Sequence, residues 1–293
     1  MAGTLPGEPV PNDFVDVARG ALAGIGVGAL IARQRRRADA RQVTDTWTTL
    51  LEGREPQPRH FTPDMLADAP DIARRYLTRA IAPGTPLHRV VELDMDGTFT
   101  LKGRALPLRA RQVLSPPARG FVWQADIGSG WGRVSGSDGC LTGGVRVISW
   151  TKFRMAGIIP VVRQEDSLDH ARSAVTRTLI ESVWVPAALL PPHGAHWTQT
   201  GPDTAHIRFA SVPDHPPLHV TLTTDGDILE AWTMRWSDAN ADRRYRLQPF
   251  GGRMGAWREF QGFRIPSRVE IGHHWGTPDY APFFEATITG ARY

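Results

Sequence analysis

Cysteine and lysine are almost absent from this sequence. Cys140 is the only cysteine in 293 residues, which excludes an internal disulfide and a metal site built from several thiolates. A chain without disulfides is typical of a reducing compartment, so we expect a cytoplasmic protein. Lysine occurs only as Lys102 and Lys152, and all the other basic residues are arginine. Almost all the positive charge in this chain is therefore carried by arginine.

The motifs of common catalytic and cofactor sites are missing as well. Neither lysine follows a Gly-x-x-x-x-Gly run, and no Gly-x-Ser-x-Gly nucleophile elbow occurs. Three pairs of histidines lie close in sequence: His193 with His196, His215 with His219, and His273 with His274. The first pair flanks a turn without a nearby carboxylate, prolines split the second, and the third points to opposite faces of a strand. We therefore expect no metal, no cofactor and histidines that are solvated on the surface.

Net charge is also small, and it equals the excess of one short segment. The chain has 34 Lys and Arg against 30 Asp and Glu, a formal net charge of +4. Residues 33–41 hold five arginines and one aspartate, which accounts for the whole excess. A nucleic-acid-binding protein spreads basic side chains over a face to neutralise many phosphates. The sequence therefore predicts no nucleic-acid partner and a domain of balanced charge.

A long hydrophobic run is absent too. The uncharged stretch Gly20–Ala32 has 13 residues, whereas a helix that spans a bilayer needs about 20. Acidic residues precede it and arginines follow it, which is the reverse of a signal peptide. We interpret residues 1–13 as a disordered leader and 14–41 as an apolar helix with a basic flank. Two alternatives stay open: residues 14–37 associate with a membrane, or they form a glycine-rich segment with no membrane role.

The flanking arginines predict the topology if this segment meets a membrane. Arginine-rich flanks stay on the cytoplasmic side, so the rest of the chain would lie at the cytoplasmic face of the inner membrane. On a membrane surface, the same arginines would attract anionic lipid headgroups. Gly20, Gly24 and Gly28 are spaced four apart and place a smooth ridge on one helix face, which predicts a homodimer contact.

The remaining sequence indicates one β-rich domain. Residues 42–60 are interpreted as a helix end and a linker, and 61–293 as a single domain. Thr62-Pro63-Asp64 is typical of a helix start, and residues 71–81 place apolar side chains on one helical face. From Val91 onward, apolar and polar residues alternate as a half-buried strand requires.

Strand patterns follow one another with a single interruption. They are predicted at residues 91–96, 108–114, 120–127, 130–135, 145–153, 195–200, 205–211, 218–224, 228–236, 245–250, 256–260, 265–275 and 283–289. Asp138-Gly139, Gly143-Gly144 and Asp225-Gly226 are interpreted as tight turns. Residues 167–184 return to helical spacing, which Pro186 ends. The predicted fold class is α+β: a large curved antiparallel sheet, an open half-barrel, packed on one long helix with two short N-terminal helices.

The densest group of polar residues lies on and beside this long helix. It comprises Asp166, His170, Arg172, Ser173, Arg177 and Glu181. Arg177 and Glu181 are one helical turn apart and can pair. If that face points into a cavity, Glu181 or Asp166 with Arg177 would suit acid–base chemistry or ligand orientation. A solvated ion pair is commoner, and from the chemistry alone we expect that arrangement.

Several stretches resemble an uncharacterised bacterial family with a domain of unknown function. They are IARRYLTRAIAPGTPLHRVVELDMDG (72–97), ARGFVWQADIG (118–128), RSAVTRTLIESVWVPAALLPP (172–192), RWSD (235–238), PFGG (249–252) and IPSRVEIGHHWGT (265–277). Cys140 and Leu141 depart from the polar or aromatic pair expected before the glycine turn. The resemblance implies one extended domain and no known activity. In shape alone, the expected fold is similar to the half-barrel of lipoprotein carriers.

Three functions remain open from the sequence. The first is a non-catalytic binding module whose half-barrel holds an apolar or amphipathic, lipid-like ligand. Its candidate ligand-binding residues are Trp123, Trp131, Trp150, Trp184, Arg177, Glu181 and Arg235, with Trp232 and Trp236 as further candidates for the wall. The second is a hydrolase-type enzyme that uses Glu181 or Asp166 with Arg177. The third is a membrane-anchored interaction protein.

Overall fold

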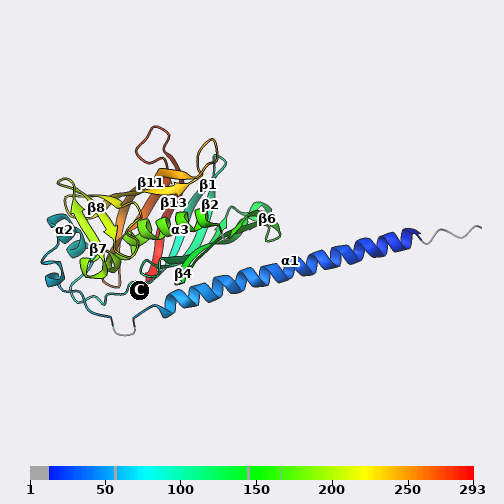
Figure 1. Cartoon of the computed structure of the whole chain (residues 1–293), viewed down its shortest axis with the longest axis horizontal. Helices are drawn as coiled ribbons and strands as arrows, with labels where there is room; N and C mark the ends of the chain where they lie inside the picture. The colour runs from blue at the N-terminus through cyan, green and yellow to red at the C-terminus, as the bar shows by residue number, and fades with distance from the viewer. Residues whose placement is uncertain (1–12, 56–57, 144–145, 166) are drawn as a thin grey trace, which may run out of the picture. The chain divides into compact units, whose positions relative to one another are not determined.

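The computed structural model describes residues 13–55, 58–143, 146–165 and 167–293, and side-chain surroundings for all of these except 13–29 and Arg146 (Figure 1). The chain separates into two compact units, Met1–Asp45 and Thr46–Tyr293. Most of the leader predicted at 1–13 lies outside the described residues.

One long helix, α1 (Asp13–Glu52), contains every described residue of the first unit and extends into the second. Its last turns belong to the second unit, where Trp47 Nε1 donates a hydrogen bond to Glu92 Oε1 at 3.1 Å. Within the described ranges, no helix has both the length and the apolar character needed to cross a bilayer. The glycine ridge of Gly20, Gly24 and Gly28 stays a prediction, because its surroundings lie outside what the structure describes.

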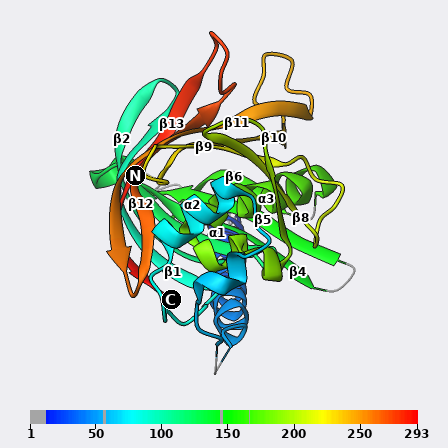
Figure 2. The ribbon, with the colours of Figure 1, turned by 90° about the vertical axis from the view of Figure 1, so that its left-hand side faces the viewer.

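The second unit is built on one antiparallel sheet of 13 strands. The strands are β1 (Val91–Leu101), β2 (Arg104–Ser115), β3 (Gly120–Ile127), β4 (Val134–Gly143), β5 (Arg146–Met155), β6 (Ile159–Glu165), β7 (Ala195–Gln199), β8 (Thr204–Phe209), β9 (Leu218–Leu222), β10 (Ile228–Ser237), β11 (Arg246–Phe260), β12 (Phe263–His273) and β13 (Ala281–Arg292). Their order is β6-β5-β4-β3-β2-β1-β13-β12-β11-β10-β9-β8-β7. The sheet curves without closing (Figure 2), which confirms the predicted α+β half-barrel.

The strand order follows from two meanders that meet in the middle of the sheet. The first runs from β1 out to the edge strand β6, and the second runs from the opposite edge strand β7 back to β13. Strand β13 then pairs with β1, for example Glu92 with Arg292. The predicted alternation in β1 is confirmed, because Val91, Leu93 and Met95 are all buried. The first and last strands of the domain therefore hold its two halves together.

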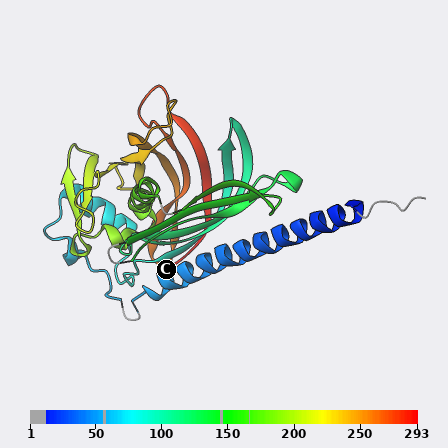
Figure 3. The same cartoon turned by 45° about the vertical axis from the view of Figure 1, so that its right-hand side comes forward.

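Helix α3 (Leu168–Ile180) connects the two edges and packs against the concave face, on β3, β4, β5 and β10. Ser167 caps it by accepting a hydrogen bond from the backbone N–H of His170. In Figure 3 the yellow-green α3 is seen nearly end-on within the curve of the sheet. The 3₁₀ turns η3 (Glu181–Trp184), η4 (Pro186–Leu189) and η5 (Pro191–His193) continue from α3 towards β7. The two short N-terminal helices are η1 (Pro63–Leu66) and α2 (Asp71–Ala80), and α2 contacts β7 and β12.

One predicted turn is wrong, and its correction shapes the site. Asp138-Gly139 lies in the middle of β4 rather than in a turn, and the strand predicted at 130–135 is a 3₁₀ turn, η2 (Gly130–Gly132), followed by the start of β4. Gly139 is opposite Trp150 on β5, and a Cβ at this position would overlap the indole ring. The glycine therefore serves close packing within the sheet and not a change of chain direction.

Candidate ligand-binding cavity

A cavity of about 420 Å³ lies between α3 and the concave face of the sheet. Its walls come from both meanders, from the β1 side through β3, β4, β5 and β6, and from β10 through β13 on the other side. Most of the wall is aromatic or aliphatic, and its rings include those of Phe99, Trp123, Phe153, Trp184, Phe250 and Phe284. The centre of this wall is Trp123, whose ring centroid lies 6.0 Å from that of Phe153 and 6.2 Å from that of Phe284. Such a wall suits an apolar ligand.

One row of inward-facing residues crosses five neighbouring strands beneath α3. Direct cross-strand pairing joins Gln112 to Trp123, Trp123 to Asp138, Asp138 to Thr151, and Thr151 to Gln164. Because the side chains of paired residues lie on the same face of a sheet, all five point to the side on which α3 packs. The polar members of this row meet the polar face of α3.

Arg177 of α3 is bound by two carboxylates. Its Nη1 lies 2.6 Å from Asp138 Oδ2, and its Nε lies 2.7 Å from Glu181 Oε1. The Arg177 side chain is 15% exposed and that of Glu181 is 13% exposed. Burial alone would lower the pKa of Arg177, but the charges of Glu181 and then Asp138 outweigh it and raise the pKa. The predicted Arg177–Glu181 contact exists, while the expectation that it is solvated is wrong.

Both carboxylate oxygens of Glu181 accept a hydrogen bond from a neighbouring side chain. One oxygen accepts from Arg177, and the other accepts from Gln112 Nε2 at 2.6 Å. Gln112 is fully buried on β2, so the contact ties the end of α3 to the row of polar residues in the sheet. This arrangement orients Glu181 and stabilises Arg177, as a structural carboxylate does.

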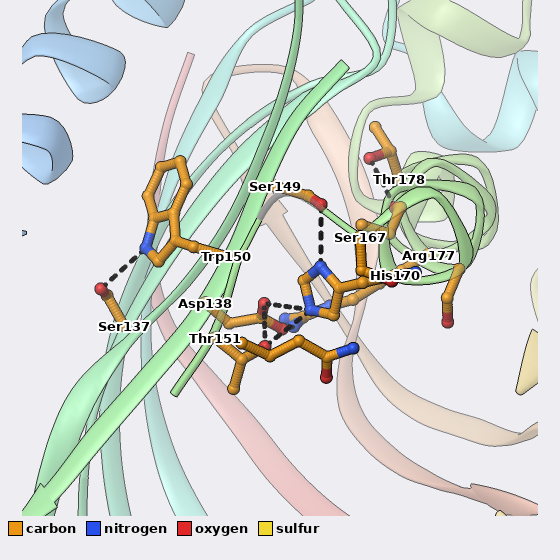
Figure 4. A network of polar contacts seen from close by, with 12 residues as sticks. Ser137, Asp138, Ser149, Trp150, Thr151, Ser167, His170, Arg177 and Thr178 are labelled. Atoms are coloured by element: carbon orange, nitrogen blue, oxygen red, sulfur yellow. Dashed lines mark hydrogen bonds and ion pairs between the residues drawn. The ribbon is translucent and has the colours of Figure 1, made fainter. Parts of the chain in front are cut away.

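His170 connects α3 to β5 through both ring nitrogens (Figure 4). Nδ1 lies 2.8 Å from Ser149 Oγ and Nε2 lies 2.9 Å from Thr151 Oγ1, which also donates to Asp138 Oδ1 at 2.9 Å. One set of proton positions satisfies every contact: Ser149 donates to Nδ1, Nε2–H donates to Thr151, and Thr151 donates to Asp138. Burial lowers the pKa of His170, which favours the neutral ring that this chain of hydrogen bonds needs.

Arg235 of β10 lies on the other side of the cavity. Its Nε donates to Ser173 Oγ on α3 at 3.0 Å, and its guanidinium carbon lies 4.5 Å from the centroid of the Phe250 ring. Burial and then the charge of Arg177 lower the pKa of Arg235 to about 10. The cavity therefore presents two arginines in different electrostatic states, one neutralised by carboxylates and one not.

Five of the predicted binding residues line this cavity: Trp123, Trp184, Arg177, Glu181 and Arg235. Trp131 does not, because it lies in η2 and is 92% exposed. Trp150 does not line it either, since neighbouring strand residues face opposite sides and Thr151 takes the cavity side. The Trp150 indole is fully buried and donates to Ser137 Oγ at 3.0 Å.

Other candidates have different surroundings. Trp232 stacks on His219 with ring centroids 3.7 Å apart, and Trp236 donates to Asp169 Oδ1 at 2.7 Å. Neither tryptophan is among the residues that line the cavity. Asp166 lies outside the described residues. The sequence did not predict Asp138, Thr151 or the phenylalanines of the wall as site residues. The one local signal for the inward face of β5 was the spacing of Ser149 and Thr151, two residues apart.

The expectation of solvated surface histidines is wrong for five of the six that were considered for metal binding. His196 is exposed, whereas His193, His215, His219, His273 and His274 are half-buried. His273 lines the cavity and stacks on Phe283 with ring centroids 5.0 Å apart. Across the described ranges, no three His, Cys, Asp or Glu side chains are grouped so that they could hold a metal ion.

Fold and cavity together define the class of this protein: an open antiparallel half-barrel with a helix across its concave face and a mainly apolar cavity between them. The chain belongs to the Family of unknown function (DUF6544), whose model matches residues 59–286. This match confirms the resemblance to an uncharacterised domain family.

The chain was also compared with curated proteins and with solved structures. None of the curated proteins matches the chain significantly. A crystal structure of a DUF1329 family protein from Desulfovibrio piger ATCC 29098 is similar at 8% sequence identity, with a TM-score of 0.41, over 76% of this chain and 90% of that chain.

Proposed function

We propose that the domain is a non-catalytic binding module that holds an apolar or amphipathic, lipid-like ligand in the half-barrel. The observation that carries this proposal is the cavity of about 420 Å³ between α3 and the sheet, whose wall is mostly aromatic and aliphatic. Small-molecule sites generally combine such a wall with a few polar groups that orient the ligand. Here the polar groups are concentrated along α3 and the strands that face it.

The contacts of the polar groups favour binding over hydrolysis. Hydrogen bonds that a carboxylate or an imidazole already makes to the protein weaken it as a general base. Both oxygens of Glu181 are already bonded, and both ring nitrogens of His170 contact hydroxyl groups of β5. Arg177 is shared between two carboxylates. These groups form a fixed framework, which supports the binding module over a hydrolase built on Glu181 and Arg177.

The test compares two alanines of the same loop. Ala239 lines the cavity, whereas Ala241 is exposed and does not line it. After delipidation, the wild-type protein should take up a fluorescent fatty acid. Ala239→Phe should weaken that uptake at least about tenfold, because the added ring occupies cavity volume. Ala241→Phe, the matched control, should bind as the wild type does.

Two results would contradict the proposal. The first is a delipidated wild-type protein that takes up no probe. The second is an Ala239→Phe variant that binds the probe with unchanged affinity, since the probe would then occupy another surface.

For the N-terminal segment we propose membrane association through residues 14–37, with the domain on the cytoplasmic side. The support is the apolar stretch Gly20–Ala32 followed by the arginines of 33–41. A homodimer through Gly20, Gly24 and Gly28 is the second proposal for this helix, and it rests on their spacing.

A further inference from the structure

The two arginines of the cavity differ in their partners. Arg177 contacts Asp138 and Glu181 at 2.6 and 2.7 Å. Among the described residues, no carboxylate oxygen lies within 4.0 Å of the Arg235 guanidinium, and its one hydrogen bond is the Nε donation to Ser173. The phenyl ring of Phe250 covers one face of this guanidinium. Arg235 therefore has a stacking partner and a neutral acceptor but no counter-ion in the described part of the chain.

The terminal nitrogens of Arg235 are not completely buried. They make no hydrogen bond to a described residue, and they are not among the buried polar atoms that lack a partner. Arg235 lines the cavity, and so do Ser173 and Phe250, the two residues that its guanidinium contacts. A planar guanidinium whose two terminal nitrogens are free is suited to bind a carboxylate or a phosphate through two hydrogen bonds.

The surroundings of Arg235 favour the binding of a negatively charged group. Burial, and after it the charge of Arg177, lower the pKa of Arg235 to about 10, and the charges of Asp138 and Glu181 offset these effects only in part. A cation removed from water without a counter-ion is unfavourable, and a bound anion relieves that cost. Burial and the charge of Arg235 also lower the pKa of nearby His273 to about 4, so this imidazole is neutral near pH 7 and does not compete for the anion.

We infer that the ligand of the half-barrel is an anionic amphiphile whose carboxylate or phosphate head binds Arg235 and whose apolar tail lies along the wall formed by Trp123, Phe153 and Phe284. The inference rests on the proposed binding function and names the chemical class of its ligand. A ligand head with one negative charge would give Arg235 a counter-ion, as Asp138 and Glu181 do for Arg177.

The experiment compares amphiphiles that share one alkyl tail. Decanoate, decyl phosphate, decanol and decyltrimethylammonium are titrated into the delipidated full chain, with binding followed by calorimetry. The wild type should bind decanoate or decyl phosphate at least about tenfold more tightly than decanol, since a charge-assisted hydrogen bond adds this much affinity. The cationic analogue should bind most weakly. Whichever anion binds more tightly identifies the head as carboxylate or phosphate.

Arg235→Gln should remove the preference for the anion while decanol still binds. Arg235→Lys, which keeps the charge but loses the planar fork, should retain part of the preference. The matched control is Arg172→Gln, because the Arg172 guanidinium also stacks on an aromatic ring, 4.2 Å from the centroid of Trp236, but does not line the cavity. This control should keep the full preference.

The outcomes separate the inference from the function on which it rests. If decanoate, decyl phosphate and decanol bind equally to the wild type, the anionic head is wrong and the binding module stands. If Arg235→Gln keeps the anion preference, the assignment to Arg235 is wrong. If none of the four compounds binds, the proposed function itself fails. Decanol affinity within each variant reports an intact cavity, and Arg235→Lys provides the test where Arg235→Gln does not fold.

Discussion

At the scale of single residues, Arg177 holds the polar side of the cavity together. Its guanidinium joins Asp138 of β4 to Glu181 at the end of α3 and lies over the rings of Phe121 and Trp123, at 4.4 and 5.4 Å from their centroids. A buried cation of this kind is stable only when carboxylates and aromatic faces replace its lost hydration. Removal of one carboxylate should therefore cost more than the loss of one surface pair.

Asp138→Asn tests this dependence. The change leaves Arg177 with one carboxylate and alters the acceptor of Thr151, so the free energy of unfolding should fall by about 3 kcal/mol. Urea unfolding measures the difference. The matched control is Asp96→Asn, since Asp96 pairs with Arg109 on the surface, where the side chains are 56% and 84% exposed. That variant should unfold as the wild type does. Equal stability of both variants and the wild type would contradict the role given to Asp138.

A second prediction at this scale concerns His273 and the pH dependence of the free energy of unfolding. Burial, followed by the charge of Arg235, lowers its pKa from 6.5 to about 4 in the folded protein. Below pH 6.5 the unfolded chain takes up a proton that the folded protein does not bind, so acid favours unfolding. The stability contributed by neutral His273 is complete above pH 6.5 and is lost as the pH falls towards 4.

Urea unfolding at a series of pH values between 4 and 7 measures this loss. His273→Gln should make the free energy of unfolding less dependent on pH over this range. His196→Gln, at an exposed histidine, should leave the dependence unchanged. A pH dependence that His273→Gln does not reduce would show that His273 titrates alike in both states.

At the scale of elements, α3 combines burial with polar side chains. Ser173, Thr176 and Thr178 are buried along with the apolar stripe of this helix. Thr176 and Thr178 donate to the backbone carbonyls of Arg172 and Ala174, four residues earlier, at 3.0 and 3.2 Å. Hydroxyl groups that are satisfied within their own helix can be buried at little cost. The helix can therefore cross the concave face and be enclosed on most sides.

In strand β4, the close packing of Gly139 against Trp150 leads to a prediction about thermal stability. Gly139→Ala would place a methyl group against the indole of Trp150, and a side chain added to a filled space should lower the thermal unfolding midpoint by several degrees. Gly132→Ala is the control, because nothing lies within 4 Å of a Cβ at that position. Circular dichroism on heating measures both midpoints. A Gly139→Ala protein as stable as Gly132→Ala would show that the sheet adapts to the added group.

The elements were largely predictable from the sequence, whereas the site was predictable only in part. Alternation in β1 and the helical spacing at 167–184 depend on residues near one another in the chain, so a single sequence reveals them. Asp138-Gly139 has the local pattern of a turn, and only the packing of Trp150 across the strand explains its glycine. Trp150 shows the same limit, because the face that a strand presents depends on its register with distant neighbours. Trp131 shows a different one, because it lies in the 3₁₀ turn η2 and not in the strand predicted there.

At the scale of the whole molecule, the chain consists of a half-barrel domain and an N-terminal helix that contains the densest cluster of arginines, five of them in residues 33–41. The formal net charge of +4 equals the excess of residues 33–41. The proposed membrane attachment and the proposed ligand binding belong to different parts of the chain and can be tested separately.

Vesicle flotation tests the attachment. The full chain should float with vesicles that contain phosphatidylglycerol, and replacement of the five arginines of 33–41 by glutamine should weaken this association at least about tenfold, because each basic residue near an anionic surface contributes. Vesicles of phosphatidylcholine alone serve as the control for charge. Equal flotation of the variant and the original chain would assign the attachment to another part of the protein.

The most direct measurement for the central claim is a crystal structure of the domain with a terminally brominated fatty acid. The account predicts an anomalous bromine signal between α3 and the concave face of the sheet, near Trp123 and Phe284, with the carboxylate at Arg235. A bromine signal on the outer face of the sheet, or a cavity that stays free of the fatty acid at saturating concentration, would contradict it.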